Sequence, residues 1–162
     1  MPIPPFIADL RTKVGTDLLW LTGVTAVVLD EGGRVLLGQR ADSGRWALIS
    51  GILEPGEQPA VAMVREIKEE TGVDAVVDAL AAIQVQEPMR YTNGDQAQYL
   101  DLLFLAHATG GEPHPADDES TAVGWFAIDD LPENTGHYTH ERLAAVADYR
   151  ADPAAGTRFE RG

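Results

Sequence analysis

The chain has 162 residues, 44% of them hydrophobic and 23% charged, which is enough for one folded domain with a substantial core. It has no cysteine, which excludes disulfides, thiolate catalysis and cysteine-type zinc sites. With 26 acidic residues against 12 basic ones the net charge is −14, which disfavours a nucleic-acid polymer as partner. No apolar run is long enough to span a membrane, and the first residues lack a signal-peptide pattern. We therefore expect no membrane association and a cytoplasmic location.

The first elements expected along the chain are a short helix and a β-hairpin. Apolar residues at helical spacing predict a leading helix over residues 6–14, closed by Gly15, within an N-terminal extension of residues 1–16. Residues 18–29 are rich in apolar and β-branched residues and predict a strand, interrupted near Gly23. The hairpin and the segment after it are then predicted as a turn, a strand, a polar loop and a short strand, at residues 30–33, 34–39, 41–45 and 46–49.

A helix is predicted from Pro59 to Thr71, because proline suits a first turn and Gly72 suits the left-handed stop. Its apolar side chains form one stripe, made of Ala60, Met63, Val64, Ile67 and Thr71. At about 100° per residue, a set of glutamates is centred roughly 110° around from that stripe. One flank of this helix can therefore be buried while the next faces an open site.

The second half of the chain predicts three strands, a hairpin turn and a closing helix. The strands are expected at residues 73–86, 97–108 and 122–128, and Asn93-Gly94-Asp95 is the strongest short hairpin signal. Leu143, Val146 and Tyr149 predict an amphipathic helix over residues 140–150. We expect one domain over residues 1–150, with a mobile tail at 151–162. The fold class is α/β or α+β, with a mixed β-sheet between helices.

The glutamates of the predicted helix suggest a metal site. Glu66, Glu69 and Glu70 stand at i, i+3 and i+4, so they share one face and repel each other. A divalent cation such as Mg²⁺ converts that repulsion into binding, since hard ions prefer carboxylate oxygens. The alternative is a solvated face with salt bridges, but Arg65 and Lys68 are too few to neutralise these acids and Glu57.

The pattern from Gly51 to Val73 resembles the complete Nudix box. Every specified position is present, namely Gly51, Glu57, Arg65, Glu66, Ile67, Glu69, Glu70, Gly72 and Val73. The order of strands, loops and the later Trp125-Phe126 segment is similar to a Nudix domain over most of the chain. One departure is Ile49-Ser50, where the family usually has Pro-Gly before the box glycine; this change narrows the backbone angles available there.

The resemblance implies a fold and a chemistry. Nudix hydrolases cleave a nucleoside diphosphate linked to another group, using Mg²⁺ or Mn²⁺ and an attacking water. Carried onto this chain, the metal ligands would be Glu66, Glu69, Glu70 and the backbone carbonyl of Gly51. Arg65 would orient the acidic cluster and hold Glu57. A neutralised phosphate and an oriented water are what phosphoryl attack requires.

A further acidic group from outside the box often completes such a site. Glu119 stands six residues before Trp125 and is our candidate for the general base or an extra metal ligand, with Asp118 as runner-up. A glutamate of the box is the other candidate for the base. The alternative for Asp117, Asp118 and Glu119 is an ordinary solvated loop.

Four residues are candidates for substrate binding. Arg40 and Arg45 flank the loop before the box, and their guanidinium groups suit phosphate oxygens, although both could serve only as surface charges. Trp46 and Tyr91 could stack on a nucleobase, as could Trp125, but aromatic residues also pack in cores. His137 and His140 are three residues apart, without an acidic third ligand at a recognised spacing, so capping or packing is favoured for them.

We therefore predict a metal-dependent pyrophosphohydrolase acting on a small nucleotide-type diphosphate. An ADP-ribose-like nucleotide sugar and a nucleoside triphosphate, including an oxidised one, both remain open. The second hypothesis is a nucleotide-binding regulator without turnover, which the intact acidic set argues against. A homodimer is suggested only by analogy with relatives. A calcium-binding structural module is disfavoured because no EF-hand loop is present.

Overall fold

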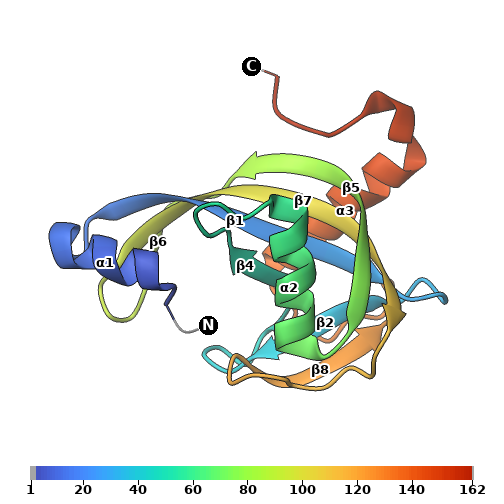
Figure 1. Ribbon diagram of the computed structural model, residues 1–162. Coiled ribbons are helices and arrows are strands. Elements are labelled where there is room, and N and C mark those ends of the chain that lie inside the picture. Colours follow the sequence, from blue (N-terminus) through green and yellow to red (C-terminus); the bar gives the residue numbers. More distant parts are fainter. Residues whose placement is uncertain (1–2, 162) are drawn as a thin grey trace.

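The computed structural model describes residues 3–161 and shows a curved sheet with helices on both faces (Figure 1). The elements follow one another in this order: α1 (Pro5–Val14), β1 (Leu18–Leu29), β2 (Val35–Arg40), β3 (Trp46–Ala47), β4 (Ile49–Ile52), α2 (Pro59–Thr71), β5 (Asp74–Val85), β6 (Met89–Arg90), β7 (Gln96–Gly110), β8 (Ser120–Phe126), α3 (His137–Ala151) and a short 3-10 turn (Pro153–Ala155).

The sheet is mixed. Its central order is β3-β2-β1-β7-β5, while β4 pairs with β1, β6 with β7 and β8 with β2. β1 and β7 run parallel from the pair Leu18–Gln96 to the pair Leu29–His107, and all other pairings are antiparallel. The parallel pair joins residues nearly eighty positions apart, so it brings distant parts of the chain to one place.

The two longer helices cover opposite faces of this sheet. Alternate side chains of a strand point to opposite faces, so β1 contributes to both layers. Val24 and Val28 pack with Met63 of α2, whereas Val27 packs with Leu143 of α3. Burying these apolar side chains is the main contribution to stability. The predicted arrangement, a mixed sheet between helices, is confirmed.

Two of the predicted strands differ from the structure. The interruption expected near Gly23 is wrong, because Gly23 pairs with Ile52 on one side and with Asp101 on the other, and β1 runs unbroken. The strand predicted at residues 46–49 is two strands separated by Leu48. They separate because β3 pairs with β2, whereas β4 pairs with β1.

The ends of the chain also lie on the domain. The predicted leading helix is confirmed, with Gly15 at its end. After α3, the backbone of Arg158 makes hydrogen bonds of 2.8 and 2.9 Å with Ala81 and Ile83 of β5, and the Thr157 hydroxyl donates to the Leu80 carbonyl. This part of the tail is therefore attached to the sheet edge, while its mobility stays a prediction. None of the helices in residues 3–161 has the length and apolarity needed to cross a membrane.

Candidate active site

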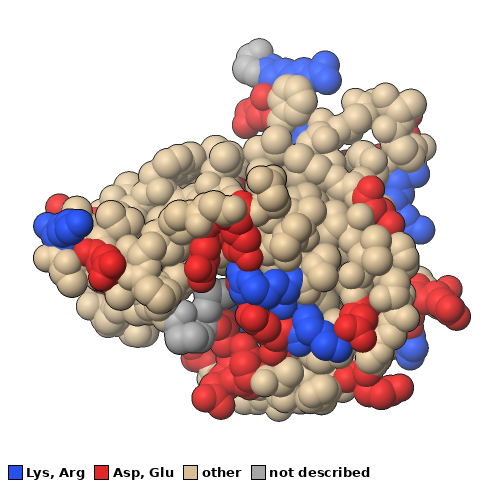
Figure 2. Space-filling model, in the orientation of Figure 1, with Lys and Arg blue, Asp and Glu red and all other residues tan. Residues whose placement is uncertain are grey.

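The charged side chains of α2 meet at Arg65. Its guanidinium donates from Nε to Glu57 at 2.8 Å, and from Nη1 to Glu66 and Glu69 at 3.0 Å each. Figure 2 shows acidic and basic side chains crowded together over α2 in the middle of this face. The hydrogen bond to Glu57 is the main cause that raises the pKa of Arg65, and the same bond lowers the pKa of Glu57. Arg65 thus links the loop before α2, through Glu57, to two glutamates of the helix.

Gly51 lies directly under Glu66. A Cβ atom built on Gly51 would stand 2.5 Å from Cγ of Glu66, closer than atoms can approach. Any side chain at position 51 would therefore displace the Glu66 carboxylate. Gly51 also lies close to Gly23 of β1: its carbonyl oxygen is 3.7 Å from the position that a Cβ atom on Gly23 would take. The box glycine is needed for this close approach between β4 and α2.

Two of the glutamates are buried. Glu66 is only 4% exposed and Glu70 only 7%. Burial raises the pKa of both carboxyl groups, since charge is costly away from water. For Glu70 the pKa rises to about 8, with the nearby charges of Glu66 and Asp117 adding to the effect of burial. The protein therefore holds a pair of acids that would each be stabilised by a nearby cation.

The loop between β7 and β8 is held against the end of α2. The amides of His114 and Ala116 donate to the carbonyls of Thr71 and Glu70, at 3.0 and 3.1 Å. These bonds satisfy carbonyl groups that a helix end otherwise leaves open. They place Asp117 close enough to Glu70 for its charge to raise the Glu70 pKa. The loop thereby brings acidic groups from outside the box to the box helix.

A small hollow separates Glu70 from Glu119. Glu70, Glu119 and Arg40 are among its lining residues, and its volume of about 10 Å³ suits about one water. Arg40 follows an irregularity in the β2–β8 pairing, of the kind that re-aims a side chain. It is ion-paired with Asp42 at 2.6 Å. Glu119 thus lines the same hollow as Glu70, while its role as general base or metal ligand stays a prediction.

A larger cavity of about 700 Å³ adjoins the glycine pair. Gly23 and Gly51 line it, and so do all four predicted substrate-binding residues, Arg40, Arg45, Trp46 and Tyr91. Trp46 packs edge-on against Phe126, and Tyr91 hydrogen-bonds through its hydroxyl to Tyr99 at 2.9 Å. Trp125 instead packs with the core cluster beneath α2 and is not among the residues that line this cavity.

The sequence analysis missed a buried ion pair in this cavity. Asp101 is 1% exposed, accepts a hydrogen bond from Thr25 at 2.7 Å, and is paired with Arg142 of α3 at 2.9 Å. All three residues line the cavity. The available signal was an acidic residue within the otherwise apolar strand predicted at 97–108. Its partner could not be identified from spacing, because 41 residues separate the two.

The donor set fits a divalent cation. Within residues 3–161, no three acidic or histidine side chains converge as a ready-made metal cage, and one oxygen each of Glu66 and Glu69 accepts from Arg65. Oε1 of Glu70, however, is buried and has no hydrogen-bond partner. Such an oxygen, beside a second buried carboxylate, is the hard ligand type that Mg²⁺ prefers. His137 is exposed and lines the larger cavity, with its ring centre 3.9 Å from that of Tyr138 in a tilted arrangement, so the capping or packing role favoured for it stays a prediction.

Comparison with known proteins agrees with the box. The model of the NUDIX domain family matches residues 20–146. The chain is 35% identical over 156 residues to the 8-oxo-dGDP phosphatase NUDT18 of Homo sapiens, covering 91% of this chain but only 43% of that protein. It is 32% identical over 136 residues to the ADP-ribose pyrophosphatase of Methanocaldococcus jannaschii, covering 81% of this chain and 75% of the relative.

A solved structure agrees as well. The MutT NUDIX hydrolase from Burkholderia pseudomallei superposes with a TM-score of 0.65 and 32% identity, over 79% of this chain and 98% of that one. Nudix hydrolases generally use divalent metals. The match spans more than the box, since it includes the sheet, α2 and most of α3. The chain therefore belongs to the Nudix family and is a pyrophosphohydrolase of the Nudix type, as its box predicted.

Proposed function

We propose that this protein hydrolyses a diphosphate linkage in a small nucleotide, by Mg²⁺-dependent attack of water on phosphorus, with Mn²⁺ as a substitute ion. The observation that carries this proposal is the buried pair Glu66–Glu70. The two carboxylates repel each other, Oε1 of Glu70 lacks a partner, and Gly51 beneath them borders a cavity of about 700 Å³. A stable fold has no need for such a pair without a cation.

Each residue of the box then has a task. Glu66, Glu69 and Glu70, with the carbonyl of Gly51, would hold the ion, and Arg65 and Glu57 would keep the carboxylates in place. When bound, a divalent ion neutralises phosphate charge and lowers the pKa of a bound water. Glu119 is our candidate to accept the proton of the attacking water, and a box glutamate is the alternative. Arg40 and Arg45 would contact phosphate oxygens.

The substrate class follows from the cavity and from relatives. A hollow of about 700 Å³ lies within the range of small-molecule sites and can hold a nucleoside besides its phosphates. Trp46 and Tyr91 offer aromatic faces for a base. We propose an ADP-ribose-like nucleotide sugar or an 8-oxo nucleotide, the compounds named for the two relatives. The protein would act in the cytoplasm, without a nucleic-acid polymer or a membrane as partner.

The second candidate is a Nudix-fold regulator that binds a nucleotide without turnover. The intact set of box acids argues against it, because a pure binder needs no cluster that activates water.

Chromatography of the products formed from a panel of nucleotides, with Mg²⁺ or with a chelator, tests the proposal. We expect turnover only with the metal, and we expect Glu70→Gln to lower kcat by about 10²–10⁴-fold. Glu31→Gln, at an exposed turn, is the matched control and should be unchanged. Full activity of Glu70→Gln would reject the metal assignment, and no turnover of any diphosphate by pure wild type would favour the regulator.

A further inference from the structure

One wall of the larger cavity comes from outside the Nudix domain. The family match begins at residue 20, whereas α1 spans Pro5–Val14. Pro4, Ile7 and Arg11 line the cavity nevertheless. Figure 1 shows α1 and β6 together at one end of the molecule, away from β2 and β8. α1 thus precedes the residues that the family model matches and reaches the larger cavity.

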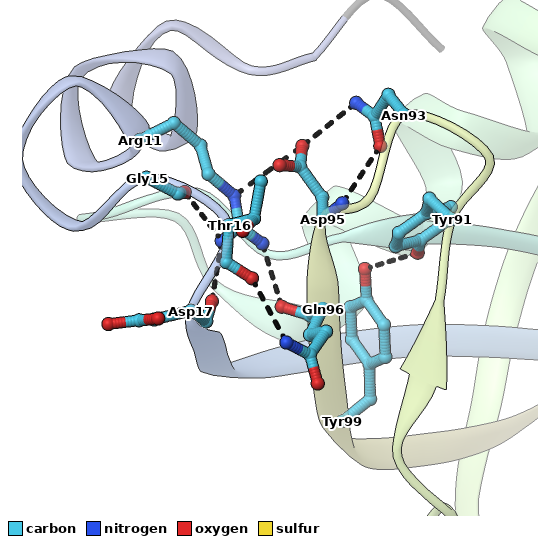
Figure 3. Close-up of polar contacts among 9 residues, drawn as sticks. All are labelled: Arg11, Gly15, Thr16, Asp17, Tyr91, Asn93, Asp95, Gln96 and Tyr99. Carbon is cyan, nitrogen blue, oxygen red and sulfur yellow. Dashed lines mark hydrogen bonds and ion pairs between the residues drawn. The ribbon is translucent and has the colours of Figure 1, made fainter.

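A single guanidinium fastens this helix. Nη1 of Arg11 donates to the carbonyls of Gly15 and Asp17, at 3.1 and 2.6 Å, and Nη2 donates to the carbonyl of Gln96 at 2.7 Å (Figure 3). Nε lies 3.6 Å from a carboxylate oxygen of Asp95. The Arg11 and Asp95 side chains are only 13% and 19% exposed, so water weakens the pair little. Arg11 therefore joins the end of α1, the chain before β1 and the start of β7.

The same carboxylate orders the hairpin between β6 and β7. The Asn93 side chain donates to Asp95 at 3.0 Å, and the Asp95 amide donates back to Asn93 at 3.1 Å (Figure 3). The amide of Tyr91 donates to the Asp95 carbonyl at 2.8 Å, which holds Tyr91 in the turn. The Tyr91 hydroxyl forms a hydrogen bond of 2.9 Å with the Tyr99 hydroxyl. Asp95 thus faces Arg11 with its carboxylate and accepts the Tyr91 amide with its backbone carbonyl.

This wall has an apolar and aromatic part beside the polar residues Thr92, Asn93 and Asp95. Ile7 is buried against Leu21, Ala97 and Tyr99, and Tyr91 borders the cavity beside them. Three N–H groups of Arg11 donate to carbonyls, and its Nε, which is buried without a hydrogen-bond partner, faces the Asp95 carboxylate, so that carboxylate balances the charge of Arg11. A phosphate is poorly matched here, whereas a neutral planar group can stack on the ring.

We propose that α1 and the hairpin at residues 89–95 bind the nucleoside half of the substrate, and that Arg11 is the positioning residue that fixes both. This inference rests on the proposed function. The bound nucleoside lies against Ile7 and Tyr91 while the diphosphate lies at Gly51 and α2. A wall so placed affects binding of the ground state and the transition state alike, and therefore KM more than kcat.

The first test compares variants kinetically with ADP-ribose and with 8-oxo-dGTP. Arg11→Met keeps the length of the side chain but removes every donor, and we expect KM to rise about tenfold while kcat stays within twofold. Arg11→Lys keeps the positive charge but loses the planar guanidinium, so its KM should lie between those of wild type and Arg11→Met. Arg34→Met breaks an exposed ion pair with Asp30, away from the cavity, and serves as control.

The second test uses the wild-type protein and needs neither turnover nor a variant. Amide hydrogen exchange is followed with α,β-methylene-ADP, with α,β-methylene-GDP and with methylenebisphosphonate, which lacks the nucleoside. We expect at least threefold slower exchange at residues 7–15 and 91–96 with the nucleotides, and no change there with the bisphosphonate. Equal exchange with all three, or an Arg11→Met enzyme with unchanged KM, overturns the inference. Failure of the proposed function is distinct, since wild type would then hydrolyse no diphosphate at all.

Discussion

At the scale of single residues, the site depends on acids placed where water cannot stabilise their charge. Arg65 donates to Glu57, Glu66 and Glu69, but the charges of Glu66 and Asp117 add to burial in raising the pKa of Glu70, and Arg40 only partly offsets them. Burial and nearby negative charges disfavour the ionised carboxylate, so such a group is stabilised by protonation or by binding a metal ion. Its stability cost in the metal-free protein can therefore be measured by titration.

We predict that the metal-free protein loses stability as the pH rises. Glu70 has a pKa of about 8 when folded against 4.5 as its ordinary value, so between these values the folded state holds a proton that the unfolded state has lost. The free energy of unfolding should fall by about 3–5 kcal/mol between pH 4.5 and 8 and then level off. Urea denaturation in the presence of a chelator, from pH 4.5 to 9, measures this fall in the free energy of unfolding.

Two comparisons check this assignment. Glu70→Gln cannot ionise, so most of the decline in the free energy of unfolding should vanish in this variant. Saturating Mg²⁺ binds only the folded state and should flatten the wild-type dependence of that free energy on pH. A decline of the same size in Glu70→Gln would place its origin in another group.

At the scale of elements, the Asp101–Arg142 pair joins α3 to the centre of the sheet. Thr25 of β1, Asp101 of β7 and Arg142 of α3 meet at one point although they are far apart in sequence. Two bonds from Arg142, at 2.9 and 3.0 Å, hold one oxygen of a carboxylate that is nearly inaccessible to water. Removing one partner of such a pair leaves the other charge buried and unpaired.

We predict that Arg142→Met lowers the free energy of unfolding by about 3–5 kcal/mol, because the buried Asp101 carboxylate loses the cation paired with it and keeps only the Thr25 hydrogen bond. The double variant Arg142→Met with Asp101→Asn should lose less than half as much, since no bare charge remains. Urea denaturation of both variants and wild type measures the difference. A loss below 1 kcal/mol in the single variant would mean that water reaches Asp101.

At the scale of the whole molecule, we propose a homodimer. The start of β1 divides between two environments: Leu21 is buried against Ile7, whereas Leu18 and Trp20 are 49% and 58% exposed. Apolar groups of that size often mark a contact surface. We predict that light scattering gives about twice the 17.4 kDa of one chain, and that Trp20→Gln shifts the protein towards one chain. A wild-type mass near 17 kDa at high concentration would contradict the dimer.

The box helix shows how far local pattern can predict a site. The limits of α2, its stop at Gly72 and the shared face of its glutamates all follow from neighbours within four residues, and the structure has them as expected. At Gly72 the backbone φ is 72°, and a Cβ there would stand 2.6 Å from Nδ1 of His114. The spacing explains why a left-handed backbone, and so glycine, is needed at position 72. It does not explain the close approach of His114, because His114 comes from a distant loop.

The sequence by itself determined the family, the acidic helix and the sheet between two helices, since periodicity and spacing are local properties of the chain. Only the tertiary structure decided that Glu70 is buried, that Asp101 meets Arg142, and that α1 walls the cavity. These features depend on the parallel pairing of β1 with β7 and on the docking of α1 and α3. Such contacts join residues from 41 to nearly 90 positions apart, and no periodic pattern records which distant side chain will be the partner.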